Sequence, residues 1–446
     1  MSTKHHDRDE DRFDDAGNTR PAGTNYIRTD SSDDGIDRRG FLRCMAWAGT
    51  ATVWAVSGGV PASFALGRAA SLTESQKKSI FFAQVSDSHI GFNKAANPDV
   101  TATLREAVAK LNALPQRPAF VLHTGDITQL AKPSEFDTAS EVLKELKTDR
   151  VLYVPGEHDV AADNGASYLA RYGKGTRGNG WYSFDHQGVH FVGLVNVLNL
   201  KAGGLGSLGA EQLAWLSRDV GRLPASTPIV VFAHVPLWTV YPAWGWGTDD
   251  SEAALALLKR FGSVTVLNGH IHQIMQKVEG SVTFHTAMST AFPQPAPGTA
   301  PAPGPMKVAP ETLKSVLGVA DVTFIPGRKT LAVVDATLSG EPPAFESLAA
   351  ASTAPRAARA RVRAPNEIGI DNFRFTPPAL RVPAGTRVTW INDDDVPHLI
   401  ASTGGRFKSS AVLDTGQRYE LTLGKPGAYP YFCALHPMMQ GTIVVT

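Results

Sequence analysis

The chain has 446 residues, of which 43% are hydrophobic, and a formal net charge of +1 at pH 7. This length is enough for two or three domains, and the apolar fraction is ordinary for a globular protein. The near-neutral charge gives no electrostatic indication of nucleic-acid binding, and two cysteines cannot build a disulfide framework, so we expect no disulfide in the mature protein.

Residues 1–75 are predicted to serve export rather than to build a fold. Residues 1–37 are rich in Asp, Arg, Ser and Gly, a composition that predicts disorder. The segment Asp37-Arg38-Arg39-Gly40-Phe41-Leu42-Arg43 follows, and its arginine pair resembles a twin-arginine export signal. The weakly hydrophobic run 44–60 is shorter than the ~20 residues of a membrane span, so we favour a cleaved signal over an anchor. This predicts a periplasmic or extracytoplasmic protein with no stable membrane anchor after cleavage.

Strands and helices alternate over residues 76–345, the first predicted domain. Strands are expected at 80–85, 119–123, 151–154, 181–184, 189–195, 228–232 and 264–267, and helices at 99–114, 133–146, 209–222 and 250–260. Two further strands, 321–325 and 330–334, are expected to close the domain. The order predicts an α/β layered domain with mixed β-sheets flanked by helices.

The remaining residues change in character. Residues 346–365 are small, basic and proline-containing, and we interpret them as a linker. Over 366–446, short strands are expected at 373–376, 379–382, 387–392, 398–401, 418–423, 428–432 and 442–445. Their close spacing predicts a small antiparallel all-β sandwich.

Five Asp/His motifs each follow a predicted strand of the first domain. They are Asp87-Ser88-His89, Gly125-Asp126, Gly156-Glu157-His158-Asp159, Ala233-His234-Val235-Pro236 and Gly269-His270-Ile271-His272. Carboxylates and imidazoles bind Zn, Mn and Fe, and open α/β sheets place their sites at the carboxyl ends of strands. Taken singly, each residue has an ordinary explanation, and we interpret His123, His186, His190 and His285 in that way. The ordered set predicts a site for two ions.

These motifs, in this order, resemble the calcineurin-like metallophosphoesterase family over about residues 78–340, and most of all its cyclic-nucleotide phosphodiesterase-like branch. The resemblance implies two divalent or trivalent ions (Mn, Fe or Zn), one of them held by Asp87, His89 and His272. Asp126 would bridge the ions, and Glu157, His234 and His270 would hold the second. His158 would be catalytic, acting on the leaving group or the phosphoryl oxygen as a general acid or an electrostatic clamp. Asp159 would either orient that imidazole or cap the loop.

Glu157 departs from the family pattern, which has Asn at this position. A third carboxylate should bind metal more tightly, yet raise the pKa of the bridging water and reduce Lewis acidity. Alternatively, Glu157 swings away and leaves the second ion loosely held.

The aromatic segment 238–246 also has two interpretations. It could form a wall that stacks a nucleobase, or it could be the ordinary packing of a long loop.

A second metal signature lies at the C-terminal end. Cys433, His436 and Met439 have the spacing C-x2-H-x2-M, and His398 lies upstream; thiolate, two imidazoles and a thioether are a blue-copper set. The alternative is a buried cysteine with methionine as core filler. The pattern resembles the cupredoxin family over about 366–446, with the tight loop of its amicyanin/plastocyanin-like members. The resemblance implies a Greek-key sandwich holding one copper ion, with Met439 rather than Met438 as the axial ligand.

Two functions from different classes follow. The leading hypothesis is an exported, dinuclear-metal-dependent phosphoesterase that hydrolyses small-molecule phosphodiesters or monoesters by a metal-bridging hydroxide, with an appended blue-copper domain. The alternative is an extracytoplasmic copper-binding or electron-transfer protein with a redox partner protein and an inactive phosphoesterase domain. The complete ligand set favours the first, and Glu157 slightly favours the second.

Overall fold

The computed structural model describes residues 52–57, 60–65, 79–198, 200–325, 331–342 and 363–446. The predicted disordered segment, the arginine pair and most of the predicted linker lie outside these residues. Within the predicted export region, β1 (Thr52–Ser57) pairs antiparallel with β2 (Val60–Ala65). In the part of the chain that is described, no helix combines the length and the apolar character needed to cross a bilayer.

The first domain contains two mixed β-sheets, as predicted. The five-stranded sheet has the order β13-β12-β3-β4-β5, with β3, β4 and β5 parallel and β12 antiparallel to both of its neighbours. Its strands are β3 (Ile80–Val85), β4 (Val121–His123), β5 (Val151–Tyr153), β12 (Gly318–Phe324) and β13 (Ala332–Thr337).

The six-stranded sheet has the order β10-β11-β9-β8-β7-β6. Its four central strands are parallel, and β6 and β10 pair antiparallel at the two edges. Its strands are β6 (Tyr182–His186), β7 (Val189–Gly193), β8 (Ile229–Phe232), β9 (Val264–Asn268), β10 (Gln276–Glu279) and β11 (Val282–Thr286).

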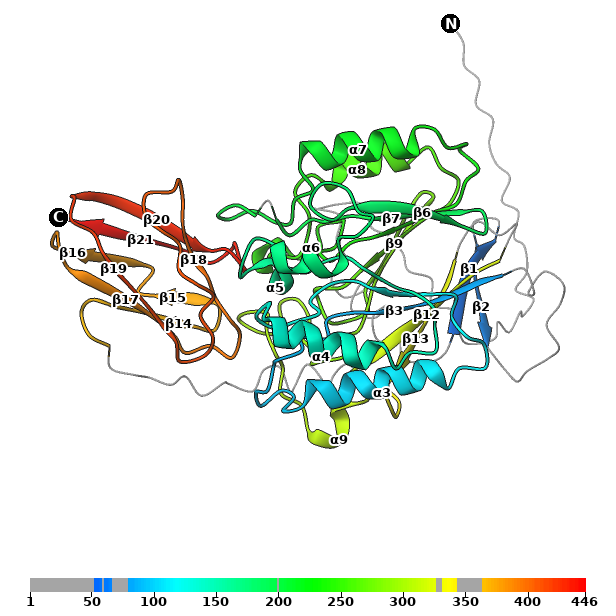
Figure 1. The fold of residues 1–446 in the computed structure, drawn as a ribbon, viewed down its shortest axis with the longest axis horizontal. Coiled ribbons are helices and arrows are strands. Elements are labelled where there is room, and N and C mark those ends of the chain that lie inside the picture. The colour runs from blue at the N-terminus through cyan, green and yellow to red at the C-terminus, as the bar shows by residue number, and fades with distance from the viewer. Residues whose placement is uncertain (1–51, 58–59, 66–78, 199, 326–330, 343–362) are drawn as a thin grey trace, which may run out of the picture. The chain divides into compact units, whose positions relative to one another are not determined.

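The two sheets pack face to face between two layers of helices (Figure 1). Phe82, Phe120, Phe191 and Phe232 fill the space between the sheets, where edge-to-face ring pairs lie 5.2–5.4 Å apart. Helices α3 (Val100–Asn112) and α4 (Pro133–Leu143) cover the five-stranded sheet. Helices α7 (Ala210–Val220) and α8 (Ser251–Leu258) cover the other. Burial of both faces explains why the central strands are continuous apolar runs.

Local signals set the ends of these helices. Asp99 caps α3 by accepting a hydrogen bond from the Ala102 N–H at 2.9 Å, and Pro133 begins α4.

Several elements were not predicted. Strand β10 is exposed along its whole length, and so carries no pattern of apolar burial. The short elements α5 (Glu157–Val160), α6 (Ala166–Tyr172), α9 (Pro310–Leu313) and the 3₁₀ turn η1 (Pro242–Trp244) have too few turns to show helical periodicity.

The C-terminal domain is a sandwich of two four-stranded sheets, β15-β14-β17-β19 and β16-β21-β20-β18. Its strands are β14 (Glu367–Asp371), β15 (Arg374–Thr376), β16 (Ala379–Val382), β17 (Arg387–Asn392), β18 (Ile400–Ser402), β19 (Arg418–Thr422), β20 (Gly427–Cys433) and β21 (Gln440–Val445). The predicted all-β sandwich is confirmed, but not every strand pair is antiparallel as expected, because β14 pairs parallel with β17 and β16 pairs parallel with β21. Trp390 and Tyr431 are the largest side chains of its core.

Candidate metal centres

The candidate ligands of the first domain converge into two groups. Asp87, His89 and His272 form one: His89 Nε2 lies 3.1 Å from His272 Nε2, which lies 3.4 Å from an Asp87 carboxylate oxygen. Asp87 follows β3, and His272 follows β9 of the other sheet. The packing of the two sheets therefore brings together residues that are far apart in the sequence.

Glu157, His234 and His270 form the second group. The two carboxylate oxygens of Glu157 lie 3.0 Å from His234 Nε2 and 3.0 Å from His270 Nδ1. Among the described residues, Glu157 Oε2, His234 Nε2 and His270 Nδ1 are buried atoms without a hydrogen-bond partner. Such converging, unsatisfied lone pairs are costly unless a cation binds them, so the set fits a metal ion.

Asp126 joins the two groups. Its Oδ2 lies 3.5 Å from His89 Nε2 and 3.3 Å from His234 Nε2, while its Oδ1 accepts the His158 backbone N–H at 3.0 Å. One carboxylate oxygen thus faces an imidazole from each group. This is the geometry that a carboxylate shared between two ions needs.

Backbone carbonyls and one amide orient three of the imidazoles. The Nδ1 atom of each lies against an acceptor: Gln129 Oε1 at 2.9 Å for His89, the Thr124 carbonyl at 2.7 Å for His234 and the Phe292 carbonyl at 2.6 Å for His272. Each Nδ1 therefore carries a proton that an acceptor binds, and this turns each Nε2 into the site. Gln129 was not predicted from the sequence, where its place three residues after Asp126 was the available signal.

The backbone at this site is strained. Asp87, His89, Asp126, His270 and His272 all have positive φ, between 42° and 71°. Non-glycine residues adopt this conformation at a cost, and such strain is concentrated at functional sites. Gly156 and Gly269 allow the loops to approach, since a Cβ at either position would overlap the carboxylate of Asp126 or Asp87, respectively.

Burial and charge act against each other in the cluster. Burial would raise the pKa of Glu157, but the neighbouring His270 and His234 outweigh it and hold the pKa well below its usual range. Burial lowers the pKa of His89 to about 3, despite the nearby Asp126. His89 is thus neutral at pH 7, the form of imidazole that binds a metal.

His158 lies beside the cluster and lines its pocket. Its Nδ1 lies 2.9 Å from the Gln129 carbonyl and carries a proton, while its ring lies 4.8 Å from the ring of His89. Burial disfavours the imidazolium, but the carboxylates of Asp126 and Glu157 outweigh this and raise the pKa of His158.

Asp159 caps the loop. Among the described residues, no hydrogen bond joins its carboxylate to the imidazole of His158. Its carboxylate accepts the backbone N–H groups of Ile127, Thr128 and Gly156 at 2.9–3.1 Å. The loop that carries Asp126 is thereby tied to the loop that carries Glu157. The Gln129 carbonyl takes the orienting position that Asp159 was alternatively expected to fill.

Three of the other histidines of the first domain have ordinary polar partners, whereas the ring of His186 packs edge-on against Phe120 and its buried Nε2 has no hydrogen-bond partner among the described residues. His123 lies 3.0 Å from the Ser88 hydroxyl, His190 lies between Asp185 and Asp219, and His285 contacts Asp335 at 3.0 Å.

The residues of the aromatic segment 238–246 have two kinds of surroundings. Trp238 packs on Phe284, whereas Trp244 and Trp246 line the pocket beside the ligand cluster.

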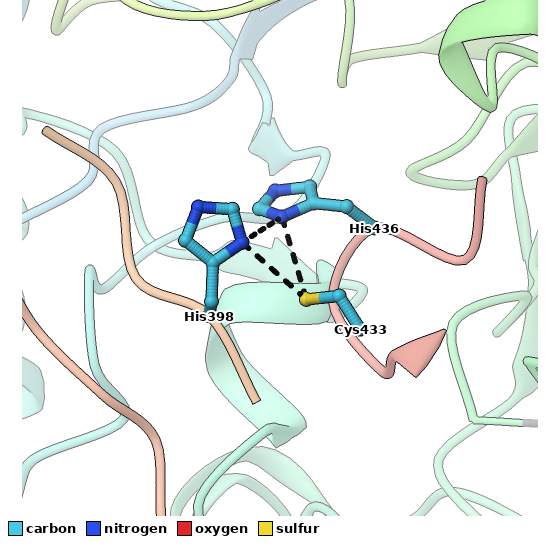
Figure 2. Close-up of side chains that lie close together, drawn as sticks. All are labelled: His398, Cys433 and His436. Carbon is cyan, nitrogen blue, oxygen red and sulfur yellow. Dashed lines mark hydrogen bonds between the residues drawn. The ribbon is translucent and has the colours of Figure 1, made fainter. Parts of the chain in front are cut away.

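The second centre lies in the C-terminal domain, where the side chains of His398, Cys433 and His436 point toward one another (Figure 2). Cys433 Sγ lies 3.5 Å from His398 Nδ1 and 3.7 Å from His436 Nδ1, and the two Nδ1 atoms are 3.3 Å apart. Cys433 ends β20 and pairs across the sheet with Ile400 of β18, which places His398 beside it.

Neighbouring groups favour the thiolate form of Cys433 and orient the imidazole of His398, and both effects favour metal binding. Burial would raise the pKa of Cys433, but hydrogen bonds with His398 and His436 outweigh it and lower the pKa well below its usual range. A thiolate is the form that binds copper. Asp394 Oδ2 lies 3.2 Å from His398 Nε2, so Nδ1 is the nitrogen turned to the sulfur, and the Leu399 N–H donates to the sulfur at 3.5 Å. The role of Asp394, four residues before His398, was not predicted from the sequence.

The two methionines of the loop have different surroundings. Met439 is 3% exposed and belongs to the same hydrophobic core as Cys433, and its backbone bonds to both Cys433 and His436. Met438 Sδ instead lies 3.7 Å from the position that a Cβ at Gly245 would occupy. Met439 thus packs in the core that contains Cys433, whereas Met438 faces Gly245 of the first domain.

These geometries define a hydrolytic-type site of carboxylates and imidazoles in an α/β domain, and a thiolate–imidazole site in a β-sandwich. Residues 82–274 match the family model of calcineurin-like phosphoesterases, and residues 344–445 match that of the cupredoxin-like domain. The chain belongs to the cupredoxin family through its C-terminal domain and carries a calcineurin-like phosphoesterase domain before it.

Relatives of both parts are known. Amicyanin-alpha of Methylorubrum extorquens is 34% identical over 83 residues, which cover 18% of this chain and 70% of the relative. Glycerophosphodiester phosphodiesterase GpdQ of Enterobacter lignolyticus is 28% identical over 204 residues, covering 44% of this chain and 71% of the relative. Among solved structures, a novel purple cupredoxin from Nitrosopumilus maritimus is 36% identical, covering 18% of this chain and 98% of that chain, with a TM-score of 0.17.

Proposed function

We propose that this protein is an exported, dinuclear-metal-dependent phosphoesterase, acting on phosphodiesters or monoesters, with an appended blue-copper domain. The observation that carries the proposal is the convergence of two ligand groups on one shared carboxylate, Asp126. Asp87, His89 and His272 would hold one ion, and Glu157, His234 and His270 the other. Mn, Fe or Zn suits such oxygen and nitrogen ligands.

Bound ions would supply Lewis acidity, which neutralises charge on the phosphoryl group and activates water. His158 would supply the proton. Its Nδ1 is held by the Gln129 carbonyl, which leaves Nε2 for the pocket, and the nearby carboxylates favour its charged form. It would donate from Nε2 to the leaving oxygen, or stabilise the charge that develops on the phosphoryl oxygens.

The similarity to a glycerophosphodiester phosphodiesterase supports small phosphodiesters as the first substrates to test. Trp244, Trp246 and Phe292 give the pocket an apolar side that would contact the organic part of such an ester. The test is hydrolysis of bis-p-nitrophenyl phosphate and p-nitrophenyl phosphate by mature protein reconstituted with Mn, Zn or Fe, with His270→Ala as control. Metal-dependent turnover that the variant lacks supports the proposal, and a folded, metal-loaded protein without turnover overturns it.

Glu157 has its own test. If it is a ligand, Glu157→Ala should lose about one metal equivalent, and retention of both ions would overturn the assignment. The matched variant Glu157→Asn restores the family amide. We expect it to bind the second ion less tightly and to turn over faster once saturated, because one carboxylate fewer leaves the ions more acidic.

The copper domain would hold one copper ion through His398, Cys433, His436 and Met439. The alternative function, electron transfer with an inactive phosphoesterase domain, has only Glu157 in its favour, and Glu157 lies within reach of both His234 and His270. Metal analysis of the purified protein separates the two: a phosphoesterase contains about three metal equivalents, and a pure copper protein contains one.

Export through the twin-arginine route is supported by the Arg38-Arg39 pair and the weakly apolar run after it. Fractionation of cells that express the full chain tests this. The double variant Arg38→Lys and Arg39→Lys should keep the protein inside the cell, whereas the same exchange at Arg20 and Arg28 should not. Export of the Arg38/Arg39 variant would contradict the route.

A further inference from the structure

The cupredoxin domain contributes one side of the phosphoester pocket. The pocket is lined by Asp126, Glu157 and His158 of the first domain and also by Phe373, Val396 and His436 of the second. The rings of His158 and His436 are 6.3 Å apart, centroid to centroid. A residue beside the dinuclear cluster thus faces a candidate copper ligand.

Several separate contacts hold this side of the pocket, which we call the wall, in place. The Gly203 N–H donates to the Pro437 carbonyl at 2.7 Å, so the copper-binding loop itself is bonded to the first domain. The ring of Phe373 fits against Gly304, where a Cβ would lie only 2.7 Å from the ring. Lys94 pairs with Asp414 at 3.9 Å, at the edge of the contact.

The wall also covers the copper site. His436 is only 9% exposed, and its ring is enclosed by Phe373 at 4.7 Å and His398 at 5.0 Å, with His158 beyond. A group bound in the pocket would therefore lie against the outer edge of a copper ligand, with little water between them. Coulomb interactions are strong in such a space, because few solvent dipoles screen them.

We propose that the cupredoxin domain is a wall of the phosphoester pocket, and that across this wall an anion in the pocket and the charge of the copper centre influence each other. The inference rests on the proposed function for the location of the anion. It requires no electron transfer between the sites. An oxyanion stabilises the more positive Cu(II) state over Cu(I), so its binding lowers the reduction potential of the copper. By linkage, the oxidised protein must then bind the anion more tightly than the reduced protein.

The expected size is about a fivefold difference in phosphate affinity, at the lower end of typical couplings between sites. For a one-electron couple, at about 59 mV per tenfold change, that corresponds to a potential lower by about 41 mV. The probe is inorganic phosphate, added to the full chain loaded with copper and manganese. Spectroelectrochemistry of the copper band gives the potential, and calorimetry in the oxidised and reduced states gives the two affinities.

The outcomes separate the inference from the proposed function. A saturable fall in potential that matches the affinity ratio supports the inference, even in a protein that shows no turnover. Phosphate that binds by calorimetry without moving the potential overturns it, even in an active enzyme. A protein that binds no phosphate overturns both.

A pair of phenylalanine variants tests the wall itself. Phe373 and Phe407 are both partly buried against the core of the cupredoxin domain, but only Phe373 lines the pocket. We expect Phe373→Ala to change the KM for the bulkier bis-p-nitrophenyl phosphate more than that for p-nitrophenyl phosphate, and to reduce the phosphate-induced shift in potential. Phe407→Ala should change neither. If the two variants had the same KM values and the same phosphate-induced shift in potential, the proposal that Phe373 belongs to a wall of the pocket would be contradicted.

Discussion

The two candidate metal centres of this chain are built in opposite ways. The candidate ligands of the first centre come from five loops between Asp87 and His272, whereas three of the four candidate copper ligands lie within the seven residues from Cys433 to Met439. Five candidate ligands of the first centre have positive φ, and none of the candidate copper ligands is among the described residues with that conformation. One centre is assembled by the packing of two sheets, and the other by a single loop.

This difference has a physical consequence. A site held by distant loops depends on every contact that brings those loops together, including Asp159 on the backbone of residues 127–128 and the glycines at close approaches. A site held by one loop depends mainly on that loop and on one neighbouring strand. We therefore expect the dinuclear centre to be sensitive to many substitutions and the copper centre to few.

The largest effect is expected from Asp126→Ala, because one carboxylate oxygen of Asp126 faces an imidazole of each ligand group. Turnover should fall by more than about a hundredfold, beyond the 10- to 100-fold range of losses at outer-shell partners, and both ions should bind weakly. Metal analysis and p-nitrophenyl phosphate hydrolysis measure the two effects. Asp149→Ala, with a side chain that is 87% exposed, is the control and should change neither. Full metal content in Asp126→Ala would show that the two groups bind ions independently.

Cys433→Ser tests whether the copper centre is as self-contained as its local construction indicates. The hydroxyl cannot replace the thiolate, so the blue absorption and tight copper binding should be lost. Turnover at the dinuclear centre should change by less than about tenfold, since no ligand there is altered and couplings between sites are typically modest. Absorption spectra and kinetics are the measurements. Loss of the dinuclear metals in this variant would contradict the comparison.

Gln129→Met should produce an intermediate effect on the dinuclear centre. The side chain of Gln129 holds the Nδ1 of His89, and its loss should weaken metal binding by about 10- to 100-fold without removing a ligand. Metal titration followed by calorimetry measures this. Gln212→Met is a matched control, because Gln212 is equally buried but bonds only to the backbone of Val195 and Leu208. It should lower thermal stability and leave metal affinity unchanged.

The smallest effect is expected away from both centres, at His190. Burial lowers its pKa, but hydrogen bonds with Asp219 and Asp185 outweigh this and raise the pKa above its ordinary value of 6.5. A raised folded-state pKa contributes stability that is fully present below about pH 6.5 and is lost as the pH rises through the folded value. The gap in Tm between the protein and His190→Gln should thus be larger at pH 6 than at pH 9, by about 2 °C. A gap that widens toward pH 9 would contradict the assignment.

The order of most strands and helices was predictable because most of them have a local signal. The strands Ile80–Val85, Ala379–Val382 and Arg387–Asn392 have the bounds that their apolar runs predicted. The exposed strand β10 and the single-turn helix α5 were not predicted, because their residues carry no pattern of burial. The parallel pairing of β14 with β17 was also missed, since the direction of a strand is set by its partners and not by its own residues.

The sequence by itself determined which residue types were available for each candidate metal centre, because carboxylates, imidazoles and thiolates each favour a class of metal ions. It also determined the copper loop, whose ligands are close in sequence and therefore close in space. Only the tertiary structure decided that Asp126 faces both ligand groups, that Gln129 and Asp394 orient the histidines, and that His436 faces His158. These contacts join residues from different sheets and domains, and their distances follow from packing, which no local pattern of residues encodes.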